Sequence, residues 1–168
     1  MQTLPTLVPK LVLNQNLRAL RMRRYDFGGG ESIEEGTTHV IDILPKDEVL
    51  RLNPNYTGQV IYGDITMPLA LPPTEHINVS QVLRYHNSES NFLQDDIIDF
   101  PKLRRVAHNI HYALRPGGTV HIFDHCVLAS LVTGMLIPLG YTVTRAELIN
   151  PADADCPEEW RFELTKGQ

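Results

Sequence analysis

Residues 24–44 read RYDFGGGESIEEGTTHVIDIL, and this stretch decides the fold. Alternating apolar residues at 21–27 predict a short strand that runs into three glycines. The β-branched run at 39–44 predicts a second strand, which stops at Pro45. Glycines after a strand allow the backbone to approach a ligand closely, although a plain turn would use them equally well. The link between the two strands, 31–38, is too short for a full crossover helix.

Strand and helix patterns alternate along the rest of the chain. Apolar residues recur at intervals of three and four at 99–114, and a dense apolar stretch follows at 127–139, which predicts two helices. Apolar and β-branched runs predict further strands at 59–62, 76–83, 119–123, 141–148 and 160–165. This order favours an α/β fold with helices on a mainly parallel sheet and the last two strands as an antiparallel hairpin at one edge.

The composition is that of one ordinary globular domain covering residues 1–168. Of the 168 residues, 42% are hydrophobic and 21% are charged, and the two cysteines are too few for a disulfide framework. Residues 1–16 contain Pro5 and Pro9, so we expect an irregular lead-in there. The net charge of -5 gives no general attraction for phosphate polymers, and we therefore expect no nucleic-acid partner.

Two features of the sequence bear on location. The first residues lack a charged start followed by a continuous apolar core, which argues against an export signal. The most apolar stretch, 127–139, is shorter than the roughly 20 residues that a membrane span needs. We therefore expect a cytoplasmic protein with no membrane partner.

Asp42 lies near the end of the second predicted strand. An acidic side chain there can accept hydrogen bonds from both hydroxyls of a ribose, although strand-end aspartates are also common in plain loops. The glycines are followed by Glu31, Glu34 and Glu35, with no lysine of the kind found in phosphate-binding loops. These carboxylates would repel a pyrophosphate but tolerate a cation. The segment therefore predicts an adenosine-containing cationic ligand rather than a dinucleotide.

Several segments, in the same order, resemble the motifs of class I S-adenosylmethionine-dependent methyltransferases. Asp26 with the glycines resembles the first motif, HVIDILP with Asp42 the ribose-binding strand, and Gly63-Asp64-Ile65 the adenine-binding segment. NVSQVL at 78–83 is similar to the fourth motif, and ALRPGGTV at 113–120 to a helix-to-strand motif. The resemblance covers nearly the whole chain and is closest to short variants whose first helix is reduced.

The resemblance implies a Rossmann-like methyltransferase sandwich that transfers a methyl group from S-adenosylmethionine to an unidentified acceptor. It implies that the methionine part of the cofactor is bound by Asp26, Gly28, Gly29 and Gly30. The ribose would be bound by Asp42, and the adenine by Asp64 and Ile65. Gln81, in the fourth motif, is a further cofactor-binding candidate. The alternative is a methyltransferase-like protein that binds or scaffolds without catalysing transfer.

Tyr85 and His86 follow the strand of the fourth motif and are the candidates for catalysis at the acceptor. A histidine has the ordinary pKa of a base near neutral pH, although an exposed loop histidine looks the same in sequence. Asp124 and His125, at the end of another predicted strand, could line the same cleft. The histidines show no familiar ligand spacing, so we expect no metal site. A large acceptor would need loops, a second copy of the chain or a protein partner to hold it.

Overall fold

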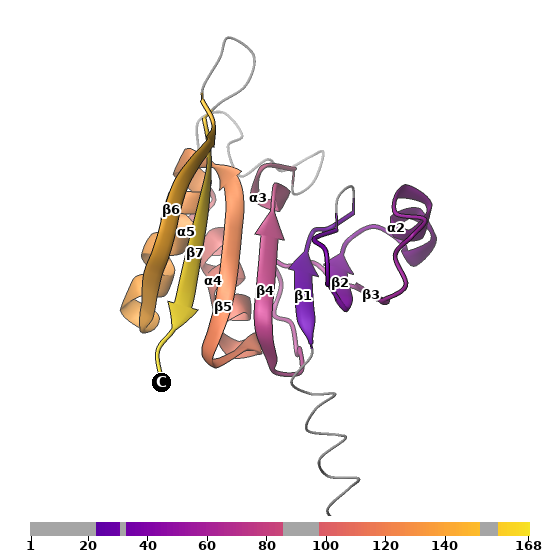
Figure 1. Ribbon diagram of the computed structural model, residues 1–168, viewed down its shortest axis with the longest axis horizontal. Helices are drawn as coiled ribbons and strands as arrows, with labels where there is room; N and C mark the ends of the chain where they lie inside the picture. Colours follow the sequence, from indigo (N-terminus) through magenta and orange to yellow (C-terminus); the bar gives the residue numbers. More distant parts are fainter. Residues whose placement is uncertain (1–22, 31–32, 86–97, 152–157) are drawn as a thin grey trace, which may run out of the picture.

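The computed structural model describes residues 23–30, 33–85, 98–151 and 158–168. These residues build one seven-stranded sheet in the order β3-β2-β1-β4-β5-β7-β6 (Figure 1). In chain order the strands are β1 Arg24–Phe27, β2 His39–Asp42, β3 Gln59–Tyr62, β4 Thr74–Ser80, β5 Leu114–His125, β6 Tyr141–Asn150 and β7 Glu159–Lys166. The residues predicted to form an irregular lead-in, 1–16, lie outside the described part of the chain.

The sheet is mainly parallel, as the sequence predicts. β1 pairs in parallel with both β2 and β4, and the pairs β2–β3 and β4–β5 are also parallel. β7 is antiparallel to both of its neighbours, β5 and β6, so the predicted antiparallel hairpin at one edge is confirmed. The strand order reverses between β1 and β4, and open α/β sheets bind ligands beside such a point, at the carboxyl ends of the strands.

The helices are α2 Lys46–Leu52, α3 Val82–Tyr85, α4 Phe100–Ala113 and α5 Cys126–Leu136, with a 3-10 turn at Ile137–Leu139. Two of them, α4 and α5, lie together behind the sheet in Figure 1. The carboxylate of Asp99 caps α4 by accepting a hydrogen bond from the backbone N–H of Lys102 at 3.1 Å, and Pro101 stands in the first turn. Both long helices predicted from the sequence are therefore present.

The hydrophobic core lies between α4, α5 and one face of the sheet. Alternate residues of the central strands point into it, and they are fully or almost fully buried: Tyr25, Phe27, Ile77, Val79, Val120 and Ile122. The helices contribute apolar residues at intervals of three and four, among them Val106 and Ile110 of α4 and Leu128 and Val132 of α5. This packing fixes the positions of the strand ends where the candidate residues lie.

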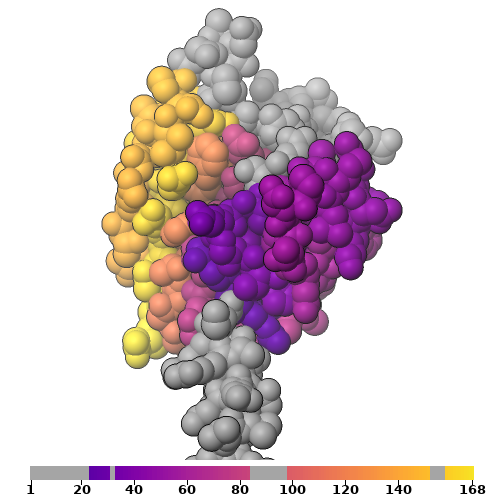
Figure 2. Space-filling view, turned by 45° about the vertical axis from the view of Figure 1, so that its right-hand side comes forward, coloured from indigo at the N-terminus to yellow at the C-terminus, as the bar shows by residue number. Residues whose placement is uncertain are grey.

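The other face of the sheet is polar, and none of the described helices lies across its centre. The side chains on this face alternate with those of the core, and they include Asp26, His76, Asn78 and His121. Figure 2 shows the first described residues of the chain, in indigo, beside later parts of the chain in orange and yellow. The short helix α2 lies at the β3 end of the molecule in Figure 1.

Three boundaries differ from the predictions. The strand predicted at 76–83 ends at Ser80, and the chain then turns at Gln81 into α3. The strand predicted at 119–123 already begins at Leu114, directly after α4, and a register shift opposite Thr74 absorbs the intervening turn. Helix α2 was not expected, because its seven residues are too few to show a helical period. In the described residues, no helix combines the length and the apolar character needed to cross a membrane.

Candidate functional site at the carboxyl ends of the central strands

The glycine turn follows β1 directly and stays attached to the sheet. The backbone N–H of Gly28 donates a hydrogen bond to the carbonyl of Ile41 in β2 at 2.8 Å. Gly28 has a φ of +77°, and a Cβ at this position would stand 2.2 Å from a methyl group of Val82. Only glycine combines this backbone conformation with so close an approach. The turn therefore packs against the start of α3, at the end of β4.

Asp26 lies under the turn and is completely buried. Its Oδ2 accepts a hydrogen bond from the backbone N–H of Glu34 at 2.8 Å, and its Oδ1 accepts one from the side-chain amide of Asn78 at 3.1 Å. Burial raises the pKa of Asp26 to about 6, against the opposing effect of these two hydrogen bonds. The negative charges of Glu34 and Asp42 raise the pKa further. A nearby cation would reverse this effect.

Asp42 ends β2 and joins it to the turn. Its Oδ2 accepts a hydrogen bond from the backbone N–H of Gly30 at 2.9 Å, and its Oδ1 accepts one from that of Leu44 at 2.8 Å. A Cβ at Gly30 would stand 3.0 Å from Oδ2 of Asp42 and 2.7 Å from the side chain of Leu44. Each carboxylate oxygen can accept a second hydrogen bond. Within the described residues, neither Asp26 nor Asp42 forms an ion pair with Lys or Arg.

Asp64 and Ile65 follow β3, one strand further along the same edge of the sheet. The backbone N–H of Gly63 donates to the carbonyl of Asp42 at 2.8 Å, which places the two segments side by side. Oδ1 of Asp64 accepts hydrogen bonds from the backbone N–H and the hydroxyl of Thr66, at 2.7 Å and 2.6 Å. The side chain of Ile65 packs in the hydrophobic core, and its contact with adenine stays a prediction.

Gln81 lies at the end of β4 with a φ of +52°, which is uncommon for a residue other than glycine. Its backbone N–H donates to the carbonyl of Phe123 at 2.7 Å, and its side-chain amide donates to Glu159 at 3.3 Å. The side chain therefore reaches toward β7, away from Asp42. Its role in binding a cofactor stays a prediction.

The two catalytic candidates cannot be placed. Tyr85 is the last residue of α3, but its side chain and the whole of His86 lie outside the described part of the chain. Asp124 and His125 do reach the same edge of the sheet. Asp124 is buried and accepts a hydrogen bond from the backbone N–H of Leu83 at 2.9 Å, while Nδ1 of His125 accepts one from that of Val127 at 3.3 Å. Both side chains thus hold the starts of helices.

Two hydrogen-bonding partners of Asp26 were not predicted, although Glu34 was noted for its charge and Asn78 lies in the segment that resembles the fourth motif. Glu34 and Asn78 supply the hydrogen bonds to Asp26, one from the backbone and one from a side chain. Asn78 has a visible signal, because a polar residue alternates with apolar ones in the strand sequence HINVS. Glu34 has none, since its contact depends on how the turn folds back. Glu34 also joins His76 and His121, although no metal site was expected from the sequence.

Comparison with protein-family models finds no match, and comparison with curated proteins finds none. Among solved structures, the N-methyltransferase NodS from Bradyrhizobium japonicum WM9 in complex with S-adenosyl-L-homocysteine matches with a TM-score of 0.65 and 16% identity, over 95% of this chain and 88% of that chain. An S-adenosylmethionine-dependent methyltransferase from Mesorhizobium loti matches with a TM-score of 0.60 and 16% identity, over 90% of this chain and 96% of that chain. The chain has the class I methyltransferase fold, and identities this low show the fold alone.

Proposed function

We propose that this chain is a methyltransferase that binds S-adenosylmethionine at the carboxyl ends of β1, β2 and β3. The observation that carries the proposal is the position of Asp26 and Asp42 on two adjacent parallel strands beside the reversal of strand order, where Asp42 holds the glycine turn and Asp26 holds the backbone of Glu34. The similarity of the fold to methyltransferases that use this cofactor supports the same assignment.

The residues present fit S-adenosylmethionine by charge and by donor type. The cofactor carries a sulfonium and an ammonium group, and two carboxylates without a described cationic partner favour a cation. The hydroxyls of its ribose are donors, which suits the free lone pairs of Asp42. A dinucleotide fits poorly, because its pyrophosphate would face the same two carboxylates.

Each candidate residue has a stated role in this proposal. Asp42 would accept hydrogen bonds from the ribose, and Asp64 would contact the adenine together with Ile65. The glycine turn would admit the methionine part, and Asp26, buried beneath the turn, would act on it through its charge. When bound, S-adenosylmethionine supplies a methyl group activated by the positive sulfur. The chain's own task is to orient that group toward the acceptor.

The acceptor side of the proposal rests on sequence. Tyr85 and His86 are the groups proposed to face the acceptor, because they follow the strand of the fourth motif in the sequence. A second copy of the chain or a protein partner would enlarge the surface that holds a large acceptor. We also propose that the protein is cytoplasmic. The proposed reaction requires S-adenosylmethionine in the same compartment.

Isothermal titration calorimetry with S-adenosylmethionine and S-adenosyl-L-homocysteine tests the cofactor assignment. We expect both to bind with one equivalent per chain. Replacing Asp42 with Asn should weaken binding at least about 10-fold, because two hydrogen bonds to a charged group become bonds to a neutral one. The matched control is Asp47→Asn, an exposed aspartate in the first turn of α2, which should leave the affinity unchanged.

NADH is the competing ligand in the same experiment. We expect it to bind more weakly than S-adenosyl-L-homocysteine, because the carboxylates repel its phosphates. Failure of both S-adenosyl compounds to bind, or tighter binding of NADH, would contradict the proposal.

A further inference from the structure

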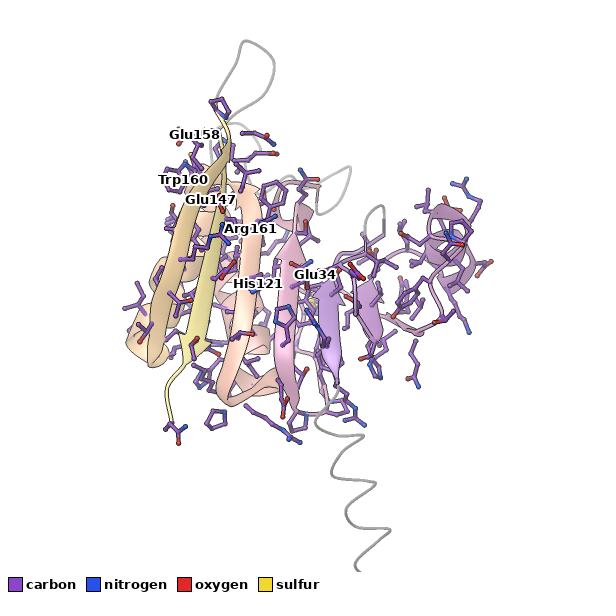
Figure 3. The ribbon with its side chains drawn as sticks, viewed as in Figure 1. Glu34, His121, Glu147, Glu158, Trp160 and Arg161 are labelled. Atoms are coloured by element: carbon purple, nitrogen blue, oxygen red, sulfur yellow. The ribbon has the colours of Figure 1, made fainter. Side chains whose placement is uncertain are left out.

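Three possible metal ligands meet on the polar face of the sheet, and one of them, Glu34, also contacts the candidate cofactor site through its backbone N–H. Glu34 comes from the segment between β1 and β2, His76 from β4 and His121 from β5. His76 pairs across the strands with Thr119, so His121 lies diagonally opposite His76 on the same face. Figure 3 shows Glu34 and His121 side by side in front of the central strands.

The atoms of these side chains that could bind a metal ion lie close together. Oε2 of Glu34 lies 2.9 Å from Nε2 of His76, and Oε1 lies 3.3 Å from Nδ1 of His121. All three donor positions lie within 4.8 Å of one another. Ligand atoms about 2.0–2.2 Å from a tetrahedral zinc ion stand roughly 3.4 Å apart. The distances from Glu34 to the two histidines, each measured to a different carboxylate oxygen, are close to this separation, so small side-chain rotations would bring one atom of each side chain onto the ion.

A hydrogen bond to Thr119 orients the buried histidine. Nδ1 of His76 lies 2.9 Å from the hydroxyl oxygen of Thr119. With an ion bound, the Nδ1–H would donate to this hydroxyl, and Nε2 would give its lone pair to the ion in place of its hydrogen bond to Glu34. Histidines that bind metals are commonly fixed in this way through the second ring nitrogen. Because His76 is only 10% exposed, its ring has little freedom to turn away.

The charges around the cluster favour a cation on balance. The carboxylate of Glu34 supplies a negative charge at the cluster, within hydrogen-bond distance of both histidines. A second carboxyl group, that of the buried Asp26, lies close by and accepts a hydrogen bond from the backbone N–H of Glu34. Arg24 opposes a cation, since its guanidinium lies 3.6 Å from Oε2 of Glu34. That guanidinium is partly exposed at the surface, so it can move into solvent when an ion binds.

We propose that Glu34, His76 and His121 bind a divalent transition metal ion such as Zn²⁺. Two histidines and one glutamate are a ligand set that zinc uses when it keeps an open fourth position. Glu34 and His121 are each nearly one-third exposed, which leaves room for water as the fourth ligand. The ion would tie the segment between β1 and β2 to β4 and β5. It would thereby also fix Glu34, whose backbone N–H holds Asp26.

Metal titration of the chelator-treated protein tests this proposal without any S-adenosyl compound, so the result is independent of the proposed function. We expect one Zn²⁺ per chain by calorimetry. Co²⁺ should give the visible absorption of a tetrahedral site with nitrogen and oxygen ligands. Zn²⁺ should also raise the thermal midpoint of unfolding, because it binds the folded chain.

The decisive variants are Glu34→Gln and His121→Ala, which remove one ligand each from partly exposed positions. We expect each to weaken Zn²⁺ binding at least about 100-fold. The loss of a residue that only supports a ligand already lowers metal affinity about 10- to 100-fold, and these variants remove a ligand itself. His108→Ala, on α4 at the other face of the sheet, is the matched control and should bind like the unaltered chain. Circular dichroism checks that each variant is folded.

Two results would overturn the proposal. One is that the unaltered chain fails to bind one equivalent of Zn²⁺. The other is equal affinity in the unaltered chain, Glu34→Gln and His121→Ala, since the ion would then occupy a different site.

Discussion

Asp26 carries the most deeply buried charge of the candidate site. Its carboxylate has no measurable exposure, and burial raises its pKa to about 6. Glu34, whose backbone N–H donates to Asp26, shows the opposite shift: its pKa is lowered, because His121 and His76 donate hydrogen bonds to its carboxylate. Two carboxyl groups linked through one backbone N–H thus titrate in different ranges. The buried carboxyl is the more useful reporter, since its pKa lies near physiological pH.

The stability of the protein should depend on the titration of Asp26. The group binds its proton up to about pH 6 in the folded chain but releases it near pH 3.8 when unfolded. Between these values the folded state holds the extra proton, so stability falls as the pH rises. The shift corresponds to about 2 to 3 kcal/mol lost between roughly pH 4 and pH 7.

Urea denaturation across that pH range measures this effect. Because an amide does not titrate, Asp26→Asn should remove the fall that is due to this residue, whereas Asp47→Asn, at an exposed position, should retain it. Identical pH profiles for the unaltered chain and Asp26→Asn would show that the buried carboxyl does not titrate in this range.

Sequence reasoning found some residues of the site and missed others for a physical reason. Asp26 and Asp42 stand at fixed places relative to predicted strands, so the edge of the sheet on which they lie follows from the pattern alone. The structure does place both at that edge. Glu34, His76 and His121 are far apart in the chain, and only the pairing of β1, β4 and β5 brings them together. Spacing along a sequence cannot show such a cluster.

At the scale of the elements, the link between β3 and β4 depends on one buried side chain. No helix forms in this link, and Asn109 of α4 supplies the hydrogen bonds instead. Its amide NH₂ donates to the carbonyls of Ile65 and Met67, each at 2.8 Å, and its Oδ1 accepts from the backbone N–H of Leu69 at 3.1 Å. Asn109 thus holds the segment that would contact the adenine.

Replacing Asn109 with Ala should reduce the free energy of unfolding by about 2 to 3 kcal/mol, because three backbone groups lose their partner and part of that segment is buried. The exposed Arg105→Ala on the same helix should change it by less than about 0.5 kcal/mol. Chemical denaturation compares the two variants. A loss as small for Asn109→Ala as for Arg105→Ala would mean that water replaces the amide without cost.

The long elements were predictable and the short ones were not. Helix α4 shows its buried face as a repeat in the sequence, and its predicted range, 99–114, exceeds the observed Phe100–Ala113 by one residue at each end. Helix α2 covers two turns and carries one buried residue, Val49, which is too little for a period to appear. The end of β4 was predicted too late in the chain, because Gln81 adopts a left-handed backbone conformation that is uncommon for glutamine and cannot be predicted from its residue type.

At the scale of the whole molecule, the two faces of the sheet differ in kind. Helices α4 and α5 enclose a single apolar core on one face, while the described part of the other face is polar and carries Glu34, His76 and His121. The candidate cofactor site lies at the carboxyl edge, between these two faces. Stability thus depends on the core, while the proposed metal lies on the polar face and the proposed S-adenosylmethionine at the carboxyl edge, and Glu34 connects these two sites.

The central claim is that S-adenosyl compounds bind at that carboxyl edge. Titrating the isotope-labelled chain with S-adenosyl-L-homocysteine and following each backbone amide by two-dimensional NMR tests it most directly. We expect the largest shifts at Gly28, Gly30, Leu44 and Asp64, and none at Gly117, which lies near the amino end of β5, at the opposite ends of the strands. Shifts centred on Gly117, or a spectrum that the ligand leaves unchanged, would contradict it.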